Sequence, residues 1–222
     1  MNNFYFSDKM DYLPYFLKHY DLNFQPTNSI CVDVESAKSI LYSGAHIATS
    51  NPYEYFHHGI VVDVDTPEIS IIHLWGYQKD DSRVQTTTLP IFLAGGLENL
   101  GKKTRRLYLI NYDGDTLEKQ QQTVKVAKEL LEKPNDIVYN LATLNCESFA
   151  YFCRTGKWTS EQIEIIKSFL VANARKIYET VKDANEQNRK NIYVVLQTIP
   201  SNALNPSERA LYDQLCQHYH SE

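Results

Sequence analysis

Hydrophobic and polar residues alternate between residues 44 and 112, and this pattern predicts a run of β-strands. Before it, the first forty residues are aromatic and irregular, apart from a short helix expected over VESAKSILYS. We therefore expect an antiparallel sheet in this part of the chain. Its predicted strands are GAHIATS, HHGIVVDVD, EISIIHLWG, VQTTTLPIFL and RRLYLINY, which are rich in β-branched and aromatic residues.

The hydrophobic period changes to that of a helix after residue 114. The segment DTLEKQQQTVKVAKELLEK predicts an amphipathic helix, with Asp115 as its N-cap, Glu118 three residues later and Pro134 beyond its end. A second helix is expected from Cys146 to Arg154, and a glycine follows it two residues later, as is common at helix ends.

Together these elements predict an α+β fold in which the antiparallel sheet packs on helices. We divide the 222 residues into an N-terminal extension (1–37), a central domain (38–158) and a helical C-terminal extension (159–222). The C-terminal extension is expected to hold two or three helices separated by Pro200 and Pro206.

The composition narrows the class of protein. Acidic residues number 27 and basic residues 22, so the net charge of -5 offers little of the counterion release that drives nucleic-acid binding. The sequence contains no run of about 18 apolar residues, so we expect no transmembrane anchor. The N-terminus also lacks the pattern of a secretory signal. We expect a soluble, cytoplasmic protein, with export as an effector left open and the oligomeric state unassigned.

The four cysteines are Cys31, Cys146, Cys153 and Cys216, and none forms a CxxC motif. The spacing of seven between Cys146 and Cys153 is poor for zinc. Intracellular proteins commonly keep such thiols free. We therefore expect no metal and no cofactor.

Two histidines lie on neighbouring predicted strands. Alternation places His58 on one face with Ile60, and His73 on one face with Ile71. A hairpin loop of two or four residues would bring the two imidazoles to the same face, whereas a loop of three would place them on opposite faces. The alternative is that each is an ordinary core histidine with its hydrogen bonds satisfied.

Cys146 occupies the first position of the second predicted helix, directly after Asn145, a favourable N-cap residue. The partial positive charge at a helix N-terminus lowers a thiol pKa, and the free amides there can bind an oxyanion. The pattern therefore predicts an activated nucleophile. The alternative is packing, because Cys146, Phe149, Ala150 and Cys153 also form one apolar stripe.

Three motifs, YFHHGIVVDV, IIHLWG and LNCESFAYFCRTGKW, resemble the lecithin:retinol acyltransferase family and its phospholipase/acyltransferase relatives over residues 40–158. In that family a His opens a strand containing Gly-Ile, a second His lies on the next strand, and a later helix begins Asn-Cys-Glu-His-Phe. His58, His73 and Cys146 match these positions, and Ser148 stands where the family usually has His. The resemblance implies a circularly permuted, papain-like NlpC-type core.

The resemblance also implies a cysteine-dependent acyltransferase. Cys146 would attack an acyl ester, with His58 as the base and His73 orienting it, and the thioester would pass to an amine, an alcohol or water. The implied partners are an acyl donor, such as a phospholipid, and an acyl acceptor. Two alternatives stay open: an NlpC-type thiol peptidase or amidase at the same site, and a binding module without activity.

Overall fold

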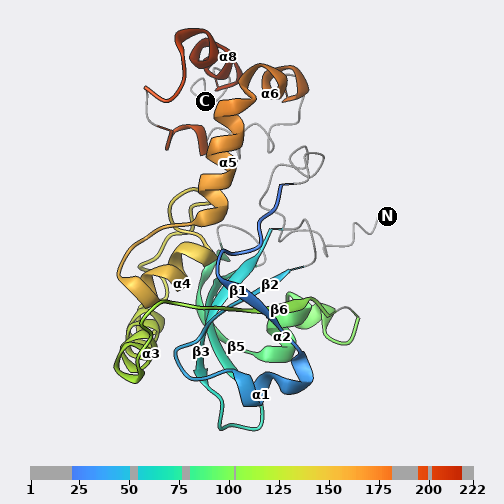
Figure 1. The fold of residues 1–222 in the computed structure, drawn as a ribbon, viewed down its shortest axis with the longest axis vertical. Coiled ribbons are helices and arrows are strands. Elements are labelled where there is room, and N and C mark those ends of the chain that lie inside the picture. Colours follow the sequence, from blue (N-terminus) through green and yellow to red (C-terminus); the bar gives the residue numbers. More distant parts are fainter. Residues whose placement is uncertain are drawn as a thin grey trace.

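A six-stranded antiparallel sheet forms the centre of the protein (Figure 1). The structure is a computed structural model that describes residues 22–50, 55–76, 81–102, 104–181, 195–199 and 202–216. The strand order is β1-β6-β2-β3-β4-β5, so β1 and β5 form the two edges. The strands are β1 (Ser29–Val32), β2 (His46–Ser50), β3 (His57–Asp63), β4 (Ser70–Trp75), β5 (Arg83–Thr88) and β6 (Arg106–Ile110).

Helices cover both faces of the sheet. The α3 and α4 helices pack on one face, called the α4 face, against Ile60 and Ile72. The α1 and α2 helices pack on the opposite face, called the α2 face, against Val61 and Ile71 (Figure 1). The helices are α1 (Ala37–Ile40), α2 (Leu89–Ala94), α3 (Leu117–Glu132), α4 (Cys146–Thr155), α5 (Glu161–Ala172), α6 (Ala174–Val181) and α8 (Pro206–Cys216), with 3₁₀ turns at Val34–Ser36 and Leu97–Asn99.

The α+β fold is confirmed, but the predicted sheet needs correction at two places. The segment VQTTTLPIFL is not one strand, because its second half forms α2, with Pro90 in the first turn, where a missing N–H costs nothing. The strand β1 was not expected, since its four residues are too few for a clear alternation. It pairs with β6, so the segment assigned to the N-terminal extension supplies an edge of the sheet.

The two central helices begin where local capping allows. The N-cap of α3 is Thr116 rather than Asp115, because the Thr116 side chain accepts the hydrogen bond from Lys119 N–H. The prediction for α4 is confirmed to within one residue, and Gly156 ends it in the left-handed conformation.

The register of β3 and β4 decides which histidines share a face. Asp63 pairs with Ser70, but a β-bulge at the next residue shifts the register, so that Ile60 pairs with Ile72. A one-residue shift moves side chains to the other face. Of the two arrangements that the sequence left open, the structure therefore has the one in which His58 and His73 lie on opposite faces, so His73 is not placed to orient His58.

The C-terminal helices continue the core around Cys146. Ile163 of α5, Ile177 of α6 and Tyr212 of α8 belong to the same buried cluster as Phe56 and Cys146. These helices stack above the sheet in Figure 1. Pro206 begins α8 and so marks a helix boundary, as the sequence predicted, whereas Pro200 lies outside the described residues. Among the described residues, no helix is both long and apolar enough to cross a bilayer.

Candidate active site

Cys146 is the first residue of α4, and a complete capping box fixes its position. Asn145 Oδ1 accepts a hydrogen bond from Ser148 N–H at 2.9 Å, and Ser148 Oγ accepts one from Asn145 N–H at 2.9 Å. Asn145 Nδ2 also donates to Leu141 O at 2.7 Å. Ser148 therefore has a structural task, which is to hold the start of the helix that carries the cysteine.

The sulfur of Cys146 lies against the backbone on both sides of His57. Sγ is 3.9 Å from Phe56 O, and the backbone N–H of His58 points at the sulfur. At this end of β3 the pairing with β4 has stopped, since the first paired residue is Ile60. The peptide groups that flank His57 are thus left open for the thiol to contact.

The thiol is not activated in the way that its helix position predicts. Burial raises the pKa of Cys146 from 9.0 to about 12, although the backbone N–H groups near the sulfur act to lower it. The prediction of a lowered pKa is wrong because the loss of hydration outweighs the helix N-terminus. Cys146 is therefore a neutral thiol in the structure as it stands.

One pair of histidines lies on the α4 face. His46 Nε2 is 2.9 Å from His58 Nδ1, and His58 Nε2 is 3.1 Å from Gln162 Nε2. The orientation of the Gln162 amide is fixed because its Oε1 accepts from Phe56 N–H at 2.7 Å and its Nε2 donates to Phe56 O at 3.1 Å. Gln162 must then donate to His58 Nε2, so His58 carries its proton on Nδ1 and donates it to His46. Both ring nitrogens of His58 are occupied.

A second pair of histidines lies on the α2 face. His57 Nε2 is 2.7 Å from His73 Nδ1, and both side chains are almost fully buried. The other ring nitrogen of His57 has no hydrogen-bond partner among the residues that the structure describes. Burial lowers the pKa of His73 from 6.5 to about 3 and holds that of His57 well below 6.5, with the neighbouring His73 as the next cause. Both rings are therefore neutral at pH 7.

Comparison of the sequence with models of known families identifies the family of the protein. The family model described as lecithin retinol acyltransferase matches residues 40–159, which is more than half of the chain. The protein belongs to the lecithin retinol acyltransferase family. Membership indicates an acyltransferase-type function with an acyl donor and an acceptor. The chain has no match among curated proteins or among solved structures.

Beyond the residues matched by the family model, α5 docks on the site through Glu147. The Glu147 carboxylate accepts hydrogen bonds from the Ser160 hydroxyl, from Glu161 N–H at 3.0 Å and from Gln162 N–H at 3.2 Å. It thus caps the N-terminus of α5, where a negative charge is favourable. Burial nevertheless raises the pKa of Glu147 from 4.5 to about 7. The helix that carries Gln162 is held in place by the residue next to the cysteine.

The predicted site consists of Cys146, His58 and His73, but the structure does not bring its two histidines into contact with each other. His58 contacts His46 and Gln162, whereas His73 contacts His57. The role of His58 as the base stays a prediction. The sequence contained one signal for the alternative, because two adjacent histidines on a strand must point to opposite faces, so His57 was always available to the face that His73 occupies. Within the described residues, no cluster of three or more His, Cys, Asp or Glu side chains is arranged to bind a metal ion.

Proposed function

We propose that the protein is a thiol acyltransferase in which Cys146 is the nucleophile, His57 the general base and His73 the residue that positions His57. The observation that carries the proposal is the place of the sulfur, which touches the peptide groups on both sides of His57. His57 and His73 each have one ring nitrogen held by the other and a second ring nitrogen without a partner among the described residues, and of the two only His57 has its flanking peptide groups against the sulfur. In a cysteine–histidine site the base needs this arrangement.

The proposal assigns one tautomer to each histidine of the pair, and these tautomers define the proton path. His57 donates its Nε2 proton to His73 Nδ1 and keeps a lone pair on Nδ1 to take the proton of Cys146. Because the thiol pKa is raised and the pKa of His57 is lowered by burial, the resting pair is neutral rather than an ion pair. Proton transfer therefore accompanies attack on the substrate.

The first-turn amides of α4 supply the oxyanion site in this proposal. Ser148 N–H is taken by the Asn145 side chain, and Phe149 N–H by Asn145 O. The N–H groups of Cys146 and Glu147 both point toward the sulfur. They are the donors that would hold the oxygen of the tetrahedral intermediate.

The reaction balances in two steps. In the first, the bond from sulfur to the acyl carbon forms, the ester C–O bond breaks, and the thiol proton passes through His57 to the leaving alcohol. In the second, an amine, an alcohol or water forms a bond to the acyl carbon, the C–S bond breaks, and the proton of the acceptor passes through His57 to the sulfur. The order of these residues along the chain, histidines before cysteine, is the order of the circularly permuted papain-like core, which we include in the proposal.

The test is acylation of Cys146 by p-nitrophenyl esters, followed by intact-protein mass spectrometry. Cys146→Ala should abolish the adduct, and His57→Ala should lower its rate by about 10³-fold or more. The matched variant is His58→Ala, which removes the adjacent histidine from the α4 face. If His58→Ala gives the large loss and His57→Ala does not, the base is His58. If no ester acylates Cys146 in the folded protein, the proposed function is wrong.

A further inference from the structure

A small cavity lies on the α2 face directly beside the His57–His73 pair. Its volume is about 180 Å³. The two imidazoles form one wall, and the other walls come from the end of β4, from β5 and from α2 with the turn that follows it. The cavity is therefore in contact with both histidines that the proposed function assigns to catalysis, whereas Cys146 is not one of its lining residues.

The walls next to the imidazoles are apolar. The Phe92 ring centre is 5.1 Å from that of His57 and 5.7 Å from that of His73. Trp75 lies parallel to His73 at a centroid distance of 6.1 Å. Ile91 and Leu97 complete this side, and the remaining lining consists of two glycines, a glutamine and a threonine.

The lining of the cavity carries no formal charge, which limits the kind of ligand that it can bind. None of its lining residues, all of which belong to the described part of the chain, is Asp, Glu, Lys or Arg. Burial keeps His57 and His73 neutral at pH 7. The nearest charged groups, the Arg105 guanidinium beside Gly95 and the Glu98 carboxylate beside Gly96, are not part of the lining. A charged headgroup would therefore lose its hydration against neutral walls, whereas an apolar chain would gain contacts with them.

The size of the cavity limits the length of that chain. A protein cavity of about 150 Å³ is enough to hold benzene, a molecule of six carbons. By the same measure, 180 Å³ holds about six to eight carbon atoms. A sixteen-carbon chain that entered here would leave about half of its length outside.

Resting on the proposed function, we propose that this cavity binds the acyl chain of the donor and selects short acyl groups of about four to eight carbons. The specificity-determining residues are Ile91 and Leu97, which line the cavity and have no part in the proposed chemistry. Gly59 supports the arrangement, because a Cβ on it would lie 2.7 Å from Ile71 Cγ2 and 3.1 Å from the Phe92 ring. A larger residue at position 59 would push the Phe92 ring away from the two histidines.

The experiment measures the rate of Cys146 acylation with p-nitrophenyl esters of two to twelve carbons, in the same non-ionic detergent throughout. The unmodified full-length protein should react fastest with esters of four to eight carbons and at least 10-fold more slowly with the ester of twelve carbons. Ile91→Trp should fill the cavity and move the optimum to two or four carbons. The control is Ile40→Trp, which places the same side chain on α1, at a half-exposed position of the same face outside the cavity.

The outcomes separate the inference from the proposed function. A flat profile, or an optimum at twelve carbons that Ile91→Trp leaves unchanged, overturns the chain-length inference while acylation of Cys146 still supports the proposed function. Absence of any Cys146 adduct with every ester overturns both. If Ile91→Trp does not fold by circular dichroism, Leu97→Trp provides the second test, since Leu97 is 63% exposed and lines the cavity from its surface side.

Discussion

Gln162 forms two hydrogen bonds with the peptide groups of Phe56, one as acceptor at 2.7 Å and one as donor at 3.1 Å. It thereby replaces the strand partner that β3 lacks at this point. Phe56 O is also the atom that the Cys146 thiol contacts. A residue of α5, outside the residues matched by the family model, thus holds the backbone on which the proposed catalytic pair depends.

Replacing Gln162 with Leu should therefore impair both stability and reaction rate. Two buried backbone groups and His58 Nε2 would lose their partner, which predicts a loss of about 2–4 kcal/mol in the free energy of unfolding. The rate of Cys146 acylation should fall by about 10-fold or more, because the backbone around His57 loosens. Gln121→Leu on the exposed side of α3 is the matched control. Equal denaturation midpoints for the two variants would contradict the role given to Gln162.

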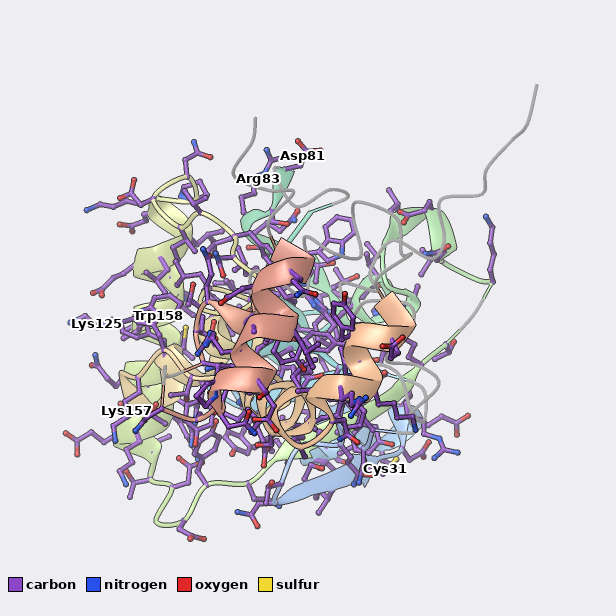
Figure 2. The ribbon with its side chains drawn as sticks, turned by 90° about the horizontal axis from the view of Figure 1, so that it is seen from above. Cys31, Asp81, Arg83, Lys125, Lys157 and Trp158 are labelled. Carbon is purple, nitrogen blue, oxygen red and sulfur yellow. The ribbon has the colours of Figure 1, made fainter. Side chains whose placement is uncertain are left out.

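Cys146 should react slowly with iodoacetamide in the absence of substrate. Its pKa of about 12, raised by burial, leaves little thiolate at pH 7.5. Cys31 lies on β1 at the periphery of the molecule and is exposed (Figure 2). Peptide mass spectrometry should find Cys146 labelled at least 10-fold more slowly than Cys31, with a rate that keeps rising up to pH 9. A rate that levels off below pH 8 would instead indicate a resting ion pair.

The protein should lose stability steeply between pH 6.5 and pH 5. The folded-state pKa of His58 and of His73 is about 3, lowered by burial, so in this window the unfolded chain binds two protons that the folded chain does not. Their contribution is complete above pH 6.5 and is lost as the pH falls, by about 3 kcal/mol per pH unit for the pair. His46 and His57, whose pKa values burial also lowers, act in the same direction.

Glu147 opposes this trend but does not cancel it. Its folded-state pKa of about 7, raised by burial, means that its contribution decreases as the pH rises from 4.5 to 7, by about 1.4 kcal/mol per pH unit. Urea midpoints at pH 8, 6.5, 5.8 and 5 give the net slope, and calorimetry in buffers of different ionisation enthalpy gives the protons bound on unfolding. Proton release at pH 5.5 would contradict the neutral buried histidines.

Arg154 and Asp115 form an ion pair at 2.7 Å whose side chains are 2% and 14% exposed. Arg154→Met should cost about 3–5 kcal/mol, because the Asp115 carboxylate would stay largely buried without its partner. The double variant with Asp115→Asn should recover part of that loss. Lys125→Met is the control, since the Lys125–Glu129 pair is exposed and should contribute less than about 1 kcal/mol. Additive single losses in the double variant would contradict the coupling.

The sequence by itself determined the elements whose signals are local. An N-cap at Asn145 and a glycine at position 156 specify α4 because capping depends on residues within one turn, and alternation specifies β2 and β3 because strand faces repeat every two residues. The helix at Leu89 was missed because a short apolar run fits a strand and a buried helix equally well.

Only the tertiary structure decided which side chains meet at the cysteine. A single bulge in β3 pairs His73 with His57 rather than with His58, and a change of one residue in register carries no signature in the hydrophobic pattern. Burial of the sulfur under α5 then reverses the sign of the thiol pKa shift that its helix position predicts. Register and desolvation both depend on residues far apart in the chain, and for that reason the sequence predicted a helix that begins at Cys146 but not the side chains around it.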